Sequence, residues 1–226
     1  MWDKGHGGRD PGTIGSGLEE AELTNKIVDY AMTYLSSNYT GFEQRATRNK
    51  GETLELMKRD DEADKWGADA FISVHINSGG GTGFESFIYN DSVPSSTKAL
   101  QDMVHGEVLA AMRKFGNVTD RGKKRADFAV LRETNMDAVL TENLFIDSTA
   151  DVKHLKNEAF IKAVGEAHAR GVAKFLSLPK KGNQEPKKQG KKVMLTTGWF
   201  YEDSPSLAEI VKLLEDLDAS YKINEV

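Results

Sequence analysis

The sequence contains no cysteine among its 226 residues. This absence excludes disulfide bonds, thiolate nucleophiles and thiolate metal sites, so His, Asp and Glu are the available metal ligands. No apolar run approaches the ~20 residues that a membrane-spanning helix needs, and we therefore expect no membrane span. The N-terminal MWDKGH has no charged stretch followed by an apolar one, so no conventional export signal is visible.

The chain also lacks an excess of positive charge. Its formal net charge of -5 argues against non-specific nucleic-acid binding, and no nucleic acid is expected as a partner. Residues 179–192 are an exception, with six lysines against one glutamate. Proline, glycine and polar residues fill the rest of this stretch, and no apolar periodicity is present. We predict a Lys-rich linker here, after a first domain of residues 1–178.

Hydrophobic periodicity in the first domain alternates between helical and strand-like patterns. Helical spacing of apolar residues predicts helices over 19–36, 53–66, 97–114 and 157–177. Short apolar runs predict strands over 70–77, 84–89, 128–132 and 138–145. Strands separated by helices indicate an α/β fold with a twisted, mostly parallel sheet flanked by helices.

A small second unit follows the linker. The pattern predicts a strand over 193–197, a helix that begins near 203–206 and runs to about 217, and a strand over 221–226. A β-α-β unit of this size is too small to be stable alone. We expect residues 193–226 to dimerise, to dock on the first domain, or to form part of a longer module.

Four residues whose side chains can bind a metal or transfer a proton lie at turns or at the ends of predicted elements. His6 lies in a glycine-rich turn, and Glu20 lies at the start of the first predicted helix. His75 and Glu142 lie at the ends of apolar strands, where open α/β sheets place their ligands. Each has a purely structural explanation when taken alone. Together, two imidazoles and one carboxylate would bind Zn²⁺ and leave a position for water, with a second carboxylate to move its proton.

The motifs around these residues resemble those of the zinc N-acetylmuramoyl-L-alanine amidases, the family of bacterial autolysins, sporulation amidases and phage endolysins. The resemblance covers residues 3–177. It is carried by DKGHGGRDPG at 3–12, GLEE at 17–20, SVHINS at 73–78 with GFES at 83–86, and VLR at 130–132 with LTEN at 140–143. These segments occur in the family's order.

The resemblance implies a peptidoglycan hydrolase that cuts the amide bond between N-acetylmuramic acid and L-alanine with Zn²⁺ as cofactor. It makes His6, Glu20 and His75 the zinc ligands and Glu142 the catalytic carboxylate. Glu19 is the alternative to Glu20, because the two acids are adjacent. Relatives begin with a hydrophobic strand before the first motif, and only two residues precede Asp3 here, so we expect most of that strand to be missing.

The second unit, residues 193–226, more loosely resembles the cell-wall-binding modules of Bacillus phage endolysins. It would bind a secondary wall polymer or form a homodimer. We expect synthesis in the cytoplasm and action on the cell wall after release by lysis, or an extracellular location if the N-terminus is truncated. Two alternative functions remain open: a zinc peptidase that cuts within the stem peptide, and a non-catalytic wall-binding protein.

Overall fold

A five-stranded sheet forms the centre of the computed structural model, which describes residues 1–182 and Lys212. The strand order is β1-β4-β7-β5-β6, and β2 and β3 form a separate hairpin. The strands are β1 (Trp2–Lys4), β2 (Ile14–Gly15), β3 (Leu18–Glu19), β4 (Ala70–Asn77), β5 (Phe84–Tyr89), β6 (Asp120–Ala126) and β7 (Asp137–Phe145). The helices are α1 (Glu20–Asn38), α2 (Leu56–Trp66), α3 (Ser95–Met112), the 3-10 turn η1 (Arg113–Phe115), α4 (Ala129–Arg132), α5 (Thr149–Leu155) and α6 (Glu158–Phe175).

The sheet is mostly parallel, as predicted. Strand β4 runs parallel to β1 and β7, and β5 runs parallel to β6. The pairing of β5 with β7 is antiparallel. The α/β class and the helical flanks are therefore confirmed, with one antiparallel pairing inside the sheet.

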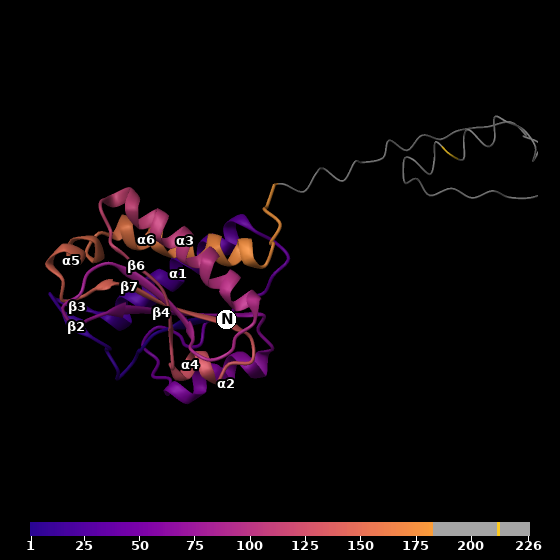
Figure 1. Ribbon diagram of the computed structural model, residues 1–226, viewed down its shortest axis with the longest axis horizontal. Helices are drawn as coiled ribbons and strands as arrows, with labels where there is room; N and C mark the ends of the chain where they lie inside the picture. The colour runs from indigo at the N-terminus through magenta and orange to yellow at the C-terminus, as the bar shows by residue number, and fades with distance from the viewer. Residues whose placement is uncertain (183–211, 213–226) are drawn as a thin grey trace, which may run out of the picture. The chain divides into compact units, whose positions relative to one another are not determined.

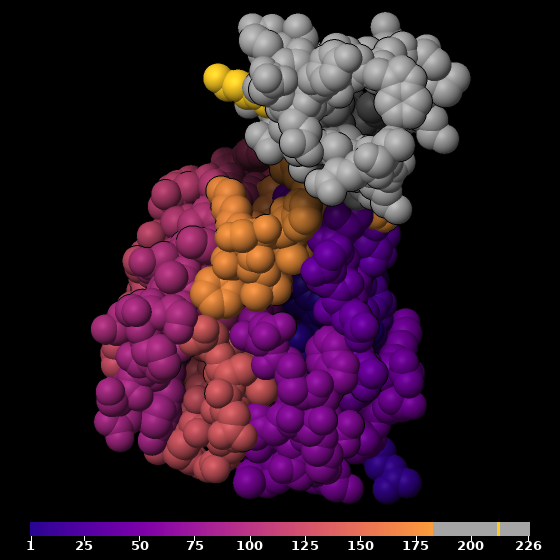
Figure 2. Space-filling model, turned by 90° about the vertical axis from the view of Figure 1, so that its right-hand side faces the viewer, coloured from indigo at the N-terminus to yellow at the C-terminus, as the bar shows by residue number. Residues whose placement is uncertain are grey.

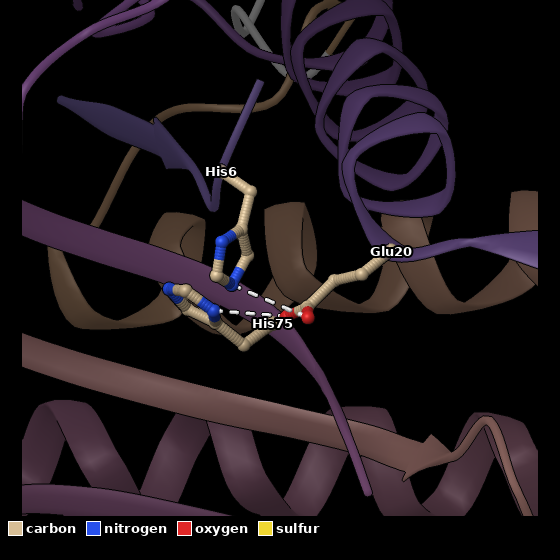
Figure 3. A group of neighbouring side chains, drawn as sticks. All are labelled: His6, Glu20 and His75. Atoms are coloured by element: carbon tan, nitrogen blue, oxygen red, sulfur yellow. Dashed lines mark hydrogen bonds and ion pairs between the residues drawn. The ribbon is translucent and has the colours of Figure 1, made fainter. Parts of the chain in front are cut away.

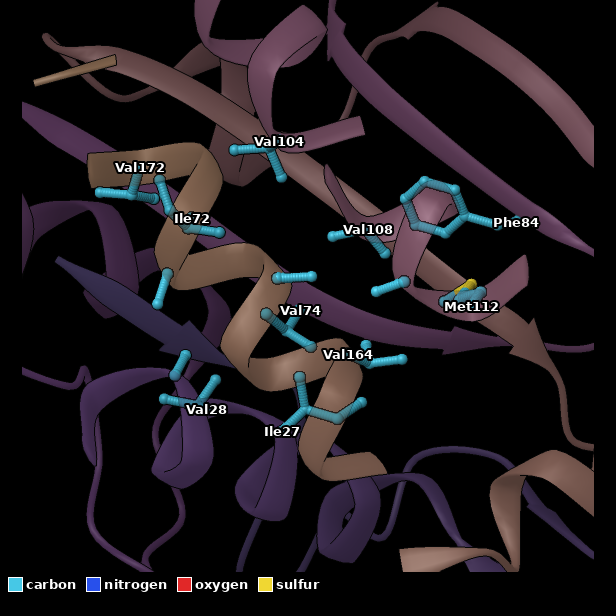
Figure 4. Close-up of a cluster of buried hydrophobic side chains, with 14 of the residues drawn as sticks. Ile27, Val28, Ile72, Val74, Phe84, Val104, Val108, Met112, Val164 and Val172 are labelled. Atoms are coloured by element: carbon cyan, nitrogen blue, oxygen red, sulfur yellow. The ribbon is translucent and has the colours of Figure 1, made fainter. Parts of the chain in front are cut away.

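Helices cover both faces of the sheet (Figure 1). On one face, α1, α3 and α6 bury the larger core, which is shown in Figure 4 and includes Ile27, Val74, Val108 and Val164. In Figure 2 the orange end of α6 lies between the magenta residues of α3 and the indigo and violet residues that include α1. On the other face, α2 and α4 cover a smaller cluster around Phe71. His75 of β4 and Glu142 of β7 lie on the same face as the Phe71 and Leu140 of this cluster, because side chains alternate along each strand.

Most predicted elements agree with the structure within a few residues. Strands β4 and β5 coincide with the predictions, and α2 ends at Gly67, which adopts the left-handed conformation expected of a helix C-terminus. The strand predicted over 128–132 is wrong. Ala129–Arg132 forms one helical turn, closed by the amides of Leu131 and Arg132 on the carbonyl of Phe128. Two consecutive buried residues in so short a segment suit either conformation, so the pattern gave no means to distinguish them.

The first strand is short but present. Residues Trp2–Lys4 pair with β4, and Trp2 also exchanges backbone hydrogen bonds with Arg45 and Thr47 on its other side. The edge of the sheet is therefore covered at this point. Strand β1 has three residues, all of them buried.

The described residues end with a short segment bonded to the end of α1. The amide of Thr40 donates to the carbonyl of Pro179, and the amide of Lys181 donates to the carbonyl of Asn38. The predicted linker from 183 onward and, apart from Lys212, the predicted elements of 193–226 lie outside the described residues. None of the helices in the described part is long and apolar enough to cross a membrane.

Candidate metal centre

The turn after β1 presents His6 in an unusual backbone conformation. His6 has φ +58°, in the left-handed region that non-glycine residues seldom adopt. Two interactions hold it there: the amide of Gly7 donates to the carbonyl of Asp10 at 2.7 Å, and Nη2 of Arg59 donates to the His6 carbonyl at 2.8 Å. The strained turn therefore gives the imidazole one direction, toward the end of β4.

Two glycines make room for the site. A Cβ on Gly5 would lie 2.7 Å from Nδ1 of His75, and a Cβ on Gly12, which has φ +66°, would lie 2.7 Å from both Glu20 and His6. Any side chain at these positions would displace the imidazoles or the carboxylate. The glycines of the first motif thus allow the backbone to pass close behind the polar groups.

Glu20 is held at both of its carboxylate oxygens. As the first residue of α1 it is almost fully buried, and it accepts hydrogen bonds from the backbone amides of Thr13 at 2.9 Å and Ile76 at 3.0 Å. The neighbouring acid, Glu19, is exposed and lies outside the cluster. The structure therefore brings Glu20, and not the alternative Glu19, to the two histidines.

His6, Glu20 and His75 converge on one point (Figure 3). Their ligand atoms all lie within 4.8 Å of one another. Nε2 of His6 is 3.2 Å from Oε2 of Glu20, and Nδ1 of His75 is 3.0 Å from Oε1. Ligands on one tetrahedral Zn²⁺, each at about 2.0–2.2 Å from the ion, stand roughly 3.3–3.6 Å apart. The spacing of these donors fits such an ion after small side-chain adjustments.

The electrostatics of this cluster also favour a cation. The hydrogen bond to Glu20 is the main reason why the pKa of His6 is raised to about 9. Burial alone would lower the pKa of His75, but Glu20 and Glu142 raise it above its ordinary value. Burial would raise the pKa of Glu20, but the two imidazoles hold it well below its usual range. A cation between these groups would take the place of the imidazole protons.

Asp10 orients the first histidine. Nδ1 of His6 lies 2.8 Å from Oδ2 of Asp10, which leaves Nε2 directed at Glu20. A carboxylate on the far nitrogen of a metal-binding imidazole fixes its tautomer and raises its basicity. Asp10 is part of the DPG motif, but the sequence gave no sign of this contact.

Glu142 lies beside the cluster on the next strand. It is the register partner of His75 on β4 and of Glu85 on β5, so these three side chains share one face of the sheet. Oε2 of Glu142 is buried and has no hydrogen-bond partner among the described residues. Burial raises the pKa of this carboxyl to about 7. A carboxyl group with such a pKa is suited to accept and return a proton near neutral pH.

The other three histidines serve packing. His105 is buried between Ser86 and Asp120, and His168 is fully buried, while His154 stacks on Phe160. The Ser86–His105–Asp120 chain has the connectivity of a hydrolase triad, but the Ser86 hydroxyl is buried and no substrate would reach it. Nucleophilic serine chemistry is therefore absent from this cluster.

Glu85 and Arg132 belong to the GFES and VLR motifs, and β6 places two cations beside Glu85. Glu85 is buried beside Glu142 and is bonded to Arg121 and Lys124 of β6. Arg132 pairs with Asp127 and Glu133 at the surface. Neither β6 nor its cations had a recognisable signal, because the strand is almost wholly hydrophilic.

Fold and site together define a class of protein. The chain is an α/β protein with a His-Glu-His candidate metal centre, at the carboxyl edge of its sheet, and a carboxylate beside it. Such a centre has three protein ligands and an open position, as catalytic rather than structural metal sites do. Residues 1–174 match the N-acetylmuramoyl-L-alanine amidase family, and the chain belongs to this family.

Individual relatives agree with this placement. The chain is 45% identical, over 79% of its length and 68% of the relative's, to the sporulation-specific N-acetylmuramoyl-L-alanine amidase of Bacillus subtilis. It is 43% identical to the endolysin of Bacillus phage SPP1, over 84% of this chain and 71% of that one. Among solved structures, the catalytic domain of the amidase CwlV from Bacillus (Paenibacillus) polymyxa matches with a TM-score of 0.72 and 30% identity, over 79% and 97% of the two chains.

Proposed function

We propose that this chain hydrolyses the amide bond between N-acetylmuramic acid and L-alanine in peptidoglycan, with Zn²⁺ held by His6, Glu20 and His75 and with Glu142 as the catalytic carboxylate. The activity is that of the family to which the chain belongs, and its substrate lies in the bacterial cell wall.

One observation supports these roles above the others. A three-donor cluster stands next to a carboxyl group, Glu142, that has a buried oxygen without a partner in the described part of the chain. An unpartnered buried carboxyl oxygen is costly, and a role in catalysis would compensate for this cost at Glu142. A wall-binding protein without catalysis has no such use for Glu142.

Zinc, when bound, would polarise the scissile carbonyl and make an attacking water more acidic. Glu142 would accept the proton of that water and return it to the nitrogen of L-alanine as the amide bond breaks. Its pKa of about 7 fits both steps, because the group must be deprotonated first and protonated afterwards. Asp10 and the amides that bond Glu20 would keep the ligands in place through this cycle.

Mass spectrometry of digested cell walls tests the bond that is cut. An amidase leaves intact glycan chains and stem peptides with free L-alanine amino termini. A peptidase that acts within the stem peptide leaves L-alanine attached to muramic acid and cuts further along. A protein that binds the wall without hydrolysis releases no fragments, so the same spectra separate all three functions.

The domain assignment belongs to the same proposal. Residues 1–178 would form the catalytic domain, 179–192 a linker, and 193–226 a module that binds a secondary wall polymer or dimerises. Release through a lysed membrane would bring the chain to the wall. Trp199 begins a run of three aromatic residues, 199–201, whose rings could stack on sugars. In the full chain, Trp199→Ala should weaken sedimentation with purified walls while cleavage of small soluble substrates stays constant. Unchanged sedimentation would remove the wall-binding role of that residue.

A further inference from the structure

The edge strand β6 carries an unusual concentration of positive charge. Its sequence, DRGKKRA, contains four cations and runs along the free edge of the sheet next to β5. The register with β5 shifts between Phe84 and Ser86, which are opposite Asp120 and Lys123, so two residues of β6 oppose Glu85 alone. One of them, Gly122, has φ +89°. This is a β-bulge, a device that redirects side chains at sheet edges.

The bulge divides the cations between the two faces of the sheet. Arg121 and Lys124 point to the face of Glu142, where both contact the buried carboxylate of Glu85. Lys123 points to the opposite face and pairs with Asp102 of α3. Arg121 and Lys124 therefore lie on the face of the candidate site, and Lys123, on the opposite face, can serve as a control.

A continuous row of polar side chains leads from the metal centre to these cations. His75 is opposite Glu142, and Glu142 is opposite Glu85, which is bonded to Arg121. Adjacent strands are about 4.8 Å apart, so β6 lies about 10 Å from β7, the strand of Glu142, and about 14 Å from β4, the strand of His75. An extended peptide covers about 14 Å in about four residues. A chain cut at the metal centre would therefore reach Arg121 within its next few residues.

Arg121 is well prepared to bind an anion. Its guanidinium carbon lies 4.8 Å from the centre of the Phe145 ring, and its Nε donates to Glu85 at 3.0 Å. Among the described residues, its two terminal nitrogens have no hydrogen-bond partner, and the side chain is 33% exposed. Stacking and the Nε bond fix the plane of the group, which leaves one edge directed outward for a second carboxylate.

The charge balance at Glu85 points the same way. The Glu85 carboxylate faces two cations, Arg121 and Lys124, and also accepts a hydrogen bond from the side-chain amide of Asn77. These two cations outnumber the one carboxylate that they contact. Surplus charge beside a catalytic carboxylate attracts an anionic substrate.

We infer that Arg121, with Lys124 beside it, binds a carboxylate of the stem peptide a few residues beyond the L-alanine whose amide is cut. This inference rests on the proposed function, because it places the scissile bond at the metal centre. The acidic stem peptide is the ligand, and the guanidinium holds one of its carboxylates through paired hydrogen bonds. The enzyme then distinguishes stem peptides with free carboxylates from those in which the same groups are amidated.

Soluble muramyl peptides that differ only in free or amidated carboxylates test this. The zinc-loaded wild type should cleave the free form with a kcat/KM about 10- to 100-fold higher, mainly through KM, as expected for a charged hydrogen bond. Arg121→Gln should remove this preference, so that the variant cleaves the two forms with similar kcat/KM. Arg121→Lys keeps a positive charge beside Glu85 but loses the paired N–H donors of the guanidinium. This variant should retain part of the preference for the free carboxylate. Lys123→Gln removes the same charge from the other face and should change neither rate.

Several results would overturn the inference. They are equal rates of the wild type on both peptides, an equal loss on both peptides in Arg121→Gln, or the same effect from Lys123→Gln. Calorimetric binding of the two peptides to the Glu142→Gln variant gives a readout without turnover. If the wild type cleaves neither peptide, the proposed function fails, whereas equal affinity of the two peptides in calorimetry counts against Arg121 alone.

Discussion

Glu85 and Glu142 are directly opposite each other on the antiparallel strands β5 and β7, yet the two carboxylates have contrasting environments. Burial would raise the pKa of Glu85, but the hydrogen bonds from Lys124 and Arg121 hold it below its usual range. Burial raises the pKa of Glu142 to about 7, and one of its oxygens is unpartnered in the described structure. Neighbouring carboxyl groups whose pKa values are driven apart can divide their tasks, one fixed in charge and one free to exchange a proton.

Glu142→Gln tests the proton-transfer role. The amide keeps the shape of the side chain but cannot accept the water's proton, so kcat should fall by about 10²- to 10⁴-fold while zinc binding is unchanged. Hydrolysis of a muramyl peptide and the zinc content of the same preparation are the measurements. Loss of zinc from this variant would show that Glu142 acts as a ligand and that the roles are assigned wrongly.

Glu20→Gln and Glu19→Gln form a matched pair, because the acids are adjacent and only Glu20 faces the two histidines. Glu20→Gln should weaken zinc binding by more than about 10²-fold, since the neutral amide replaces a charged ligand between two imidazoles. Glu19→Gln should bind zinc as the wild type does. Competition with a metal-sensitive dye measures both affinities. The reverse order would transfer the ligand role to Glu19.

The site and the fold differ in how much of each the sequence revealed. His6, Glu20, His75 and Glu142 were named because motifs surround them, and the structure gathers the first three with Glu142 on the adjacent strand. Strand β4 was predicted to the residue, since a continuous apolar run bounded by polar residues suits a strand buried on both faces.

The elements that were missed share a physical cause. Strand β6 has no apolar alternation that could reveal it. Its pairing with β5 and its ion pairs hold it at the edge of the sheet, and neither kind of contact is visible in a local sequence pattern. The single turn α4 is too short to show helical periodicity. Contacts between distant segments, such as that of Arg121 with Glu85, depend on the strand order, which no sequence motif here specifies.

Arg59→Met should destabilise the fold strongly. Arg59 pairs with the fully buried Asp3 at 2.7 Å and also donates to the carbonyl of His6. Without it, an uncompensated charge remains in the interior, at a cost of about 3–5 kcal/mol. Urea denaturation measures the free energy of unfolding. Arg9→Met, at an exposed position, is the control and should change it by less than about 0.5 kcal/mol. Similar free energies of unfolding for the two variants would contradict the stabilising role of the Arg59–Asp3 ion pair.

His168 should make the fold sensitive to acid. It is fully buried between Thr141 and the carbonyl of Val164, and burial lowers its pKa to about 4. In the unfolded chain the group takes up a proton near pH 6.5, whereas in the folded protein it stays neutral down to about pH 4. Its contribution is therefore present above pH 6.5 and is lost as the pH falls toward 4, on the order of 3 kcal/mol in total.

Urea denaturation of the wild type and of His168→Gln across this pH range isolates the effect. The variant should start with a lower stability at pH 7, and its stability should then fall less steeply between pH 6.5 and 4. Parallel curves for the two proteins would show that His168 does not resist protonation in the fold.

Titration of the metal-free protein with zinc tests the central claim most directly, with hydrolysis of a muramyl–L-alanine amide as the signal. The arrangement of His6, Glu20 and His75 predicts no hydrolysis without metal, a linear rise on addition of zinc, and saturation at one ion per chain. Full activity in the stripped protein, or activity that needs no zinc at any ratio, would contradict the assignment of these three residues as the catalytic metal centre.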